Sequence, residues 1–137
     1  MPADIFIDTN ILVYAHDLDA GHKHNIAKRF VAELWQQPNW PGVSVQVLQE
    51  LYVNLYRKGI PTLEARETVQ DYAAWHVVES SVSLLEEGMD ETERWRLSLW
   101  DGLIVAAARR IAASVIYSED LSDTQDYAGI RIVNPFV

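Results

Sequence analysis

The sequence contains no cysteine, and this absence excludes disulfide bonds, thiolate metal sites and cysteine nucleophiles. It also contains no apolar run that approaches the roughly 20 residues needed to span a bilayer. Asp4 and Asp8 interrupt the first apolar segment and no basic region precedes it, so no signal peptide is expected. We therefore expect a soluble, cytoplasmic protein that does not contact a membrane.

Basic residues are scarce, with 11 Lys and Arg against 20 Asp and Glu and a formal net charge of -9. Taken alone, this charge argues against simple electrostatic binding of nucleic acid, which depends on a basic surface. One interpretation is that the acids only maintain solubility. The other interpretation is that several acids converge and bind a cation. The positions of the acids along the chain distinguish between these two interpretations.

Glycine and proline are also few, at six and five residues, and the chain contains no repeats, low-complexity tracts or linkers. With 137 residues, of which 49% are hydrophobic, it can bury a core without disulfides or metals. We expect one domain over residues 1–137.

Short apolar segments alternate with longer segments of helical periodicity. Strands are expected at 5–7, 43–45, 77–78, 115–117 and 130–133, and helices at about 11–15, 22–35, 46–57, 62–75, 82–96 and 99–113. Thr62 is the expected N-cap of its helix. Strands that alternate with helices predict an α/β fold, with a parallel sheet covered by helices on both faces.

Four acids lie just beyond predicted strands. Asp8 and Asp120 follow strands directly, whereas Glu50 and Asp101 lie in the first turns of helices. The carboxyl ends of parallel strands share one edge of the sheet, so the four side chains are expected to converge. Clustered carboxylates repel one another, and a hard divalent cation would hold them together. A water bound to such an ion beside a phosphodiester is the machinery of a nuclease.

Each acid also has a purely structural interpretation. Asp8 could cap the helix that follows it, and Asp101 matches a capping box that begins at Ser98. Glu50 and Asp120 could be ordinary solvated side chains. Considered one by one, the residues leave these alternatives open.

Four segments together resemble a known family. They are I-D-T-N near the start, S-V-Q-V-L-Q-E-L-Y after the second strand, L-S-L-W-D-G-L-I-V-A-A-A, and Y-S-E-D-L followed by G-I-R-I-V-N-P-F. In order and spacing they resemble the PIN domain, and within that family the VapC-type toxins of bacterial toxin–antitoxin pairs. The resemblance implies a five-stranded parallel sheet. It also implies a Mg²⁺- or Mn²⁺-dependent endoribonuclease that hydrolyses RNA phosphodiester bonds, as the toxin of a type II system.

The resemblance also implies roles for individual residues. The catalytic and metal-binding acids would be Asp8, Glu50, Asp101 and Asp120. Of these, Asp8 and Asp101 would be the direct ligands, whereas Glu50 and Asp120 would bind the ion through water, orient the nucleophile or hold a second ion. Thr9 would support the Asp8 carboxylate and Asn10 the turn, while Asp123 falls where the motif varies.

The resemblance further implies a homodimer and a cognate antitoxin that places an Arg or a C-terminal segment into the acidic pocket. A basic peptide suits a chain of this charge. An RNA substrate would still have to contact positively charged side chains, and the candidates are Arg57, Lys58, Arg109 and Arg110. The alternative for these four residues is that they complement the dipoles of helix C-termini.

Three other functions remain to be weighed. A phosphoacceptor signalling domain has similar acids but needs a lysine near a late strand, and the only lysines here are Lys23, Lys28 and Lys58. A catalytically silent PIN-like module that binds a partner has no need of a complete set of clustered acids. A structural protein with scattered capping acids is the remaining alternative.

Overall fold

The computed structural model describes residues 4–137; residues 1–3 of the expected domain lie outside the described range. The elements in chain order are β1 (Ile5–Ile7), α1 (Thr9–His16), α2 (His22–Gln36), β2 (Gly42–Ser44), α3 (Val45–Arg57), α4 (Thr62–Tyr72), β3 (His76–Val78), α5 (Val82–Trp95), α6 (Leu99–Arg110), β4 (Val115–Tyr117) and β5 (Arg131–Val133). Within residues 4–137, none of these helices has the length and apolar character needed to cross a membrane.

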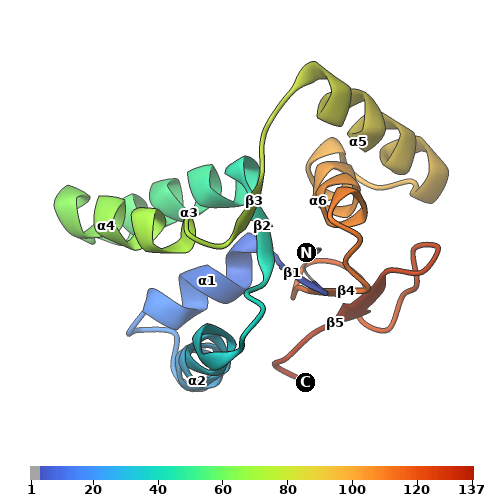
Figure 1. Cartoon of the computed structure of the whole chain (residues 1–137). Helices are drawn as coiled ribbons and strands as arrows, with labels where there is room; N and C mark the ends of the chain where they lie inside the picture. Colours follow the sequence, from blue (N-terminus) through green and yellow to red (C-terminus); the bar gives the residue numbers. More distant parts are fainter. Residues whose placement is uncertain (1–3) are drawn as a thin grey trace.

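Five parallel strands form one sheet in the order β3-β2-β1-β4-β5 (Figure 1). The central strand β1 is short and apolar, and Phe6 and Ile7 are fully buried in it. It pairs with β4 in a register that places Ile7 opposite Tyr117. Because all five strands run in the same direction, their carboxyl ends lie at one edge of the sheet. The predicted α/β fold is confirmed.

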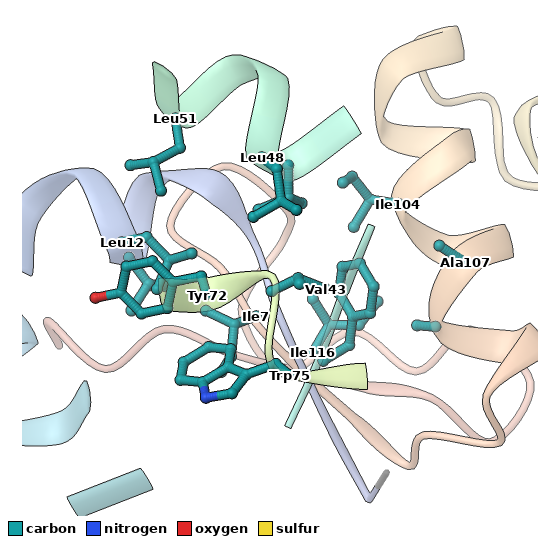
Figure 2. Packing of buried hydrophobic residues seen from close by; sticks show 14 of the residues in the cluster. Ile7, Leu12, Val43, Leu48, Leu51, Tyr72, Trp75, Ile104, Ala107 and Ile116 are labelled. Atoms are coloured by element: carbon teal, nitrogen blue, oxygen red, sulfur yellow. The ribbon is translucent and has the colours of Figure 1, made fainter. Parts of the chain in front are cut away.

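The helices form two groups on opposite sides of the sheet: α1 to α4 on the left of Figure 1, and α5 and α6 on the right. Within these groups α1 packs on α2 and α3, and α5 packs on α6. Figure 2 shows the core between the two groups, where side chains of three helices meet those of the strands: Leu12, Leu48, Leu51, Ile104, Ala107, Ile7, Val43 and Ile116. This core fixes α1, α3 and α6 around the carboxyl edge of the sheet.

The predicted start of α3 and the predicted N-cap of α4 are each wrong by one residue. Val45 belongs to α3 and not to the second strand, because Ser44 has extended backbone angles and its Oγ accepts a hydrogen bond from the Val47 N–H at 3.2 Å. Thr62 is the first residue of α4 and not its N-cap. Pro61 holds the cap position, and its lack of an N–H costs nothing there.

Two predicted helices end earlier than expected. The helix predicted over 62–75 ends at Tyr72, because residues 73–75 turn into β3 and the Trp75 N–H donates to the Tyr72 carbonyl at 3.0 Å. The helix predicted over 99–113 ends at Arg110, and Ala112 then adopts a left-handed conformation with φ of 59°. Apolar periodicity continues through both turns because their side chains still reach the core.

Close packing of α5 on α6 depends on two glycines. A Cβ on Gly102 would lie 2.6 Å from the carbonyl oxygen of Gly88 and would also clash with Thr92, whereas a Cβ on Gly88 would lie 2.5 Å from the flexible end of the Leu103 side chain. We expect Gly102→Ala to lower the free energy of unfolding by about 1–3 kcal/mol, since the backbone of α5 must move. Gly88→Ala is the matched control and should cost less. Urea denaturation measures both, and the reverse order would contradict this account.

Candidate active site at the carboxyl edge of the sheet

The site begins where β1 and β4 end side by side. The Asp8 N–H donates to the Tyr117 carbonyl at 3.0 Å, which extends the strand pairing by one residue. This pairing brings Ser118 to Asp8, and the Ser118 hydroxyl donates to Asp8 Oδ2 at 2.7 Å. The same Ser118 Oγ accepts hydrogen bonds from the N–H groups of Asp120 at 3.1 Å and Leu121 at 3.2 Å. One fully buried serine therefore ties the loop after β4 to the end of β1.

Asp8 is the N-cap of α1, and the residue is 5% exposed. Its Oδ1 accepts a hydrogen bond from the Thr9 N–H at 2.7 Å, and its Oδ2 lies 3.4 Å from the donor Asn10 Nδ2. Burial raises the pKa of Asp8 to about 6, against the lowering effect of its Ser118 and Thr9 hydrogen bonds, and the charges of Asp120 and Glu50 raise it further. The capping prediction for Asp8 is confirmed, yet capping does not explain this burial of charge.

Glu50 lies on α3 and is held from two sides. The Thr9 hydroxyl donates to Glu50 Oε1 at 2.8 Å, and Asn54 Nδ2 donates to the Glu50 backbone carbonyl at 2.8 Å. Thr9 therefore bonds Asp8 through its backbone N–H and Glu50 through its hydroxyl.

Asp101 lies in the first turn of α6, where the Ser98 Oγ accepts a hydrogen bond from the Asp101 N–H at 3.1 Å. Burial raises the pKa of Asp101, and the negative charge of Asp120 raises it further. The structure therefore brings together Asp8, Glu50, Asp101 and Asp120. The charge of Asp120 raises the pKa of both Asp8 and Asp101, and the charge of Glu50 raises the pKa of Asp8.

The four acids line one cavity of about 290 Å³, which we call the acid pocket. The other lining residues are Thr9, Asn10, Val13, Tyr14, Gln46, Asn54, Lys58, Trp100 and Ile104. Among residues 4–137, no three His, Asp or Glu side chains are arranged so that they could hold a metal ion together. The donors are nevertheless all oxygen atoms, and Mg²⁺ is usually bound by only one or two carboxylates with several waters. The oxygen donors of the acid pocket therefore suit such an ion.

A second cluster braces one wall of the acid pocket. Lys23 forms an ion pair with Glu119, and the Tyr14 hydroxyl donates to Glu119 Oε1 at 2.7 Å. The Glu119 N–H donates to Asn10 Oδ1 at 3.0 Å, and Phe136 packs edge-on against Tyr14 with ring centroids 5.2 Å apart. These contacts hold the loop after β4 against α1 and α2. Asn10 thus joins the start of α1 to the loop after β4.

Asp123 and the arginine pair of α6 lie outside the lining of the acid pocket. Asp123 Oδ1 accepts a hydrogen bond from the Asn134 N–H at 2.9 Å. Arg109 forms an ion pair with Glu91, and its Nη2 donates to the Tyr127 carbonyl at 2.8 Å. Arg110, the next residue on α6, forms an ion pair with Glu87. All three side chains thus have partners within the chain.

Arg57 and Lys58, at the end of α3, have different surroundings from the two arginines of α6. Lys58 lines the acid pocket and forms an ion pair with Asp17, with Nζ 2.9 Å from Oδ2. Arg57 is exposed in the last turn of α3. Of the four predicted RNA-contacting cations, Lys58 is therefore the one at the pocket.

Several site residues were not identified from the sequence. The hydrogen bond of Ser118 to Asp8 requires β1 and β4 to be neighbours, and strand order is not visible in the periodicity. The bonds of Glu119 to Lys23 and Tyr14 join residues about a hundred positions apart. Only the position of Trp100 beside Asp101 could have drawn attention from sequence alone.

Comparison with known proteins gives consistent matches. The family model of the PIN domain matches residues 5–128. A toxin–antitoxin complex from Klebsiella pneumoniae is 23% identical, with a TM-score of 0.68 over 96% of this chain and 97% of that chain. VapC20 from Mycobacterium tuberculosis, a toxin that cleaves the sarcin–ricin loop, is 21% identical, with a TM-score of 0.70 over 85% and 89%.

A further solved structure, VapBC2 from Rickettsia felis bound to promoter DNA, is 16% identical, with a TM-score of 0.62 over 93% of this chain and 96% of that chain. At these identities the structural matches show a shared fold. No curated protein matches the sequence at a significant level.

Proposed function

The chain belongs to the PIN domain family, and on that premise we propose that it is a metal-dependent endoribonuclease, the toxin of a type II toxin–antitoxin pair. One observation carries the proposal: the acid pocket keeps the buried Asp8 carboxyl beside three others, with its pKa raised to about 6 by burial first and then by the charges of Asp120 and Glu50. Asparagine caps a helix as well as aspartate does, so helix capping does not require this charge.

Each acid is assigned a role in this reaction. Asp8 and Asp101 would hold Mg²⁺ or Mn²⁺. When bound, such an ion supplies a water nucleophile at neutral pH and stabilises charge on the phosphate oxygens. Glu50, oriented by the Thr9 hydroxyl, would accept a proton from the attacking water, and Asp120 would hold a water or a second ion. Ser118 keeps the Asp8 carboxylate in the orientation that faces the pocket.

RNA is the proposed substrate, and two observations support it. The Mycobacterium tuberculosis neighbour is named as a toxin that cleaves the sarcin–ricin loop, which is an RNA. Lys58 is placed at the acid pocket, where it can contact a phosphate next to the cleaved bond. We also propose an antitoxin whose cationic segment occupies the acid pocket, because the solved neighbours include toxin–antitoxin complexes. The homodimer is proposed from the family resemblance alone.

Removal of metal tests the proposed function. A mixed RNA pool is incubated with the purified protein in EDTA, and then with excess Mg²⁺ or Mn²⁺ restored. We expect fragments only when the divalent ion is present, and the 5′ and 3′ ends of those fragments identify the cleaved bond. Equal cleavage in EDTA would refute the metal-dependent reaction. No cleavage under any condition would instead favour the silent, partner-binding PIN-like module.

A further inference from the structure

Trp100 differs from the other tryptophans in its surroundings. Its side chain is 63% exposed, although it lines the acid pocket next to Asp101. The other four, Trp35, Trp40, Trp75 and Trp95, all pack against other aromatic rings. Within residues 4–137 the Trp100 indole forms no ring contact and no hydrogen bond. An indole ring that is uncovered at a polar pocket is available to pack against a ligand bound there.

The backbone that carries this ring is fixed. Ser98 caps the first turn of α6, and the Gly102 N–H donates to the Ser98 carbonyl at 2.9 Å. From α3, Gln46 Nε2 donates to the Trp100 carbonyl at 3.3 Å. Trp100 is therefore presented from a rigid helix start, and binding a partner on its ring requires little additional ordering of the backbone.

The charge of the protein indicates what that partner is. With a net charge of -9, and with Arg109 and Arg110 in ion pairs, contacts to phosphate can supply only part of the binding energy for RNA. Stacking of a base on an aromatic ring does not depend on charge, and it is a main source of affinity for unpaired nucleotides.

We propose that Trp100 stacks on an unpaired base of the RNA, one whose nucleotide lies beside the phosphodiester held at Asp8 and Asp101. This inference rests on the proposed function and adds a requirement to it. The substrate must expose a base next to the cleaved bond, so loops and single strands are cleaved in preference to duplexes.

The test uses a short RNA that the wild-type protein cleaves. Trp100→Ala is expected to raise KM by about 10-fold or more while kcat stays within about threefold, because stacking contributes to binding before chemistry. Trp100→Phe should restore much of the affinity. Tyr56→Ala is the matched control, since Tyr56 is 59% exposed but lies outside the acid pocket, and its KM should equal that of the wild type.

A cycle with abasic nucleotides identifies the stacked base. Each position beside the cleaved bond is replaced in turn by an abasic nucleotide. At one position the loss of the base should weaken wild-type binding about as much as Trp100→Ala does, and should cost the variant nothing further. Additive losses at every position would overturn the inference while leaving the proposed function intact. If the wild-type protein cleaves no RNA, both fall together.

The alternative partner is protein. If Trp100 instead belongs to a contact between subunits, Trp100→Ala will shift the mass measured by light scattering and leave KM for RNA unchanged. That result would also overturn the inference.

Discussion

Replacing Asp8 with asparagine is expected to lower the rate of RNA cleavage by about 100-fold or more. The reason is that a metal-dependent reaction loses several kcal/mol of transition-state stabilisation when a carboxylate ligand of the metal ion is removed. The substitution is nearly isosteric and keeps a capping oxygen, so the fold should persist. The measurement compares cleavage rates in Mn²⁺ for wild type and variant, with circular dichroism as the check on folding. Wild-type activity in the folded variant would remove Asp8 from the mechanism.

The same variant should alter how stability depends on pH in the metal-free protein. The pKa of Asp8 is raised from 3.8 to about 6 in the folded state, mainly by burial, so the folded protein retains a proton that the unfolded chain releases. The free energy of unfolding should therefore fall as pH rises from about 4 to about 7. The fall is about 3 kcal/mol at about 1.4 kcal/mol per pKa unit.

Asp8→Asn removes this fall, because the amide does not titrate. It also places an amide N–H opposite one of the donors, the Thr9 N–H or the Ser118 hydroxyl, at a cost of about 1 kcal/mol at every pH. Urea denaturation in EDTA at about pH 4.5 and about pH 7.5 measures the difference. Asp123→Asn is the matched control, and it should keep the wild-type slope. Parallel behaviour of wild type and Asp8→Asn would contradict the assignment of the slope to Asp8.

A buried carboxyl that costs stability and can be replaced in its capping role is difficult to explain by folding alone. Glu50, Asp101 and Asp120 lie in the same cavity and increase the cost, since the charge of Asp120 raises the pKa of both Asp8 and Asp101. A divalent cation would remove that cost, and added Mn²⁺ should therefore make the wild-type stability less dependent on pH. The stability penalty and the proposed chemistry thus have the same physical origin.

The arrangement of the acids could be predicted because it follows from direction alone. Once β1 and β4 are parallel, Asp8 and Asp120 must lie at the same edge, whatever their distance in the sequence. The details could not be predicted, because they depend on which strands and side chains are neighbours. The Thr9 hydroxyl reaches Glu50 rather than Asp8, and no local pattern distinguishes those two acceptors.

The same limit applies to the predicted cations. Arg109 matched the pattern of a basic residue at a helix C-terminus, as did Lys58. Only the packing of α5 against α6 shows that Glu91, which is 6% exposed, already binds Arg109. Sequence spacing placed Lys58 no closer to the acids than Arg109, yet Lys58 lines the acid pocket.

Ser118→Ala should show how far the site depends on one hydroxyl. The Ser118 Oγ donates to Asp8 and accepts from the N–H groups of Asp120 and Leu121. Alanine leaves the buried Leu121 N–H and the partly buried Asp120 N–H without this acceptor, and the loss of a buried hydrogen bond costs about 1–3 kcal/mol. We therefore expect the free energy of unfolding to fall by roughly 3 kcal/mol at about pH 7.5.

The pH dependence of this loss separates its two causes. The Ser118 hydroxyl lowers the pKa of Asp8, although burial, the larger effect, raises it. Without that hydroxyl the charged form of Asp8 is less stable, so Ser118→Ala should cost more at about pH 7.5 than at about pH 4.5, where Asp8 is protonated in the folded protein. Ser81→Ala is the matched control, because Ser81 only caps α5, by accepting from the Leu84 N–H at 3.0 Å, and should cost about 1 kcal/mol at both pH values. If Ser118→Ala also costs the same at both, its hydroxyl supports the loop but does not stabilise the carboxylate of Asp8, and the polar connection between β1 and β4 is structural rather than part of the acid pocket's chemistry.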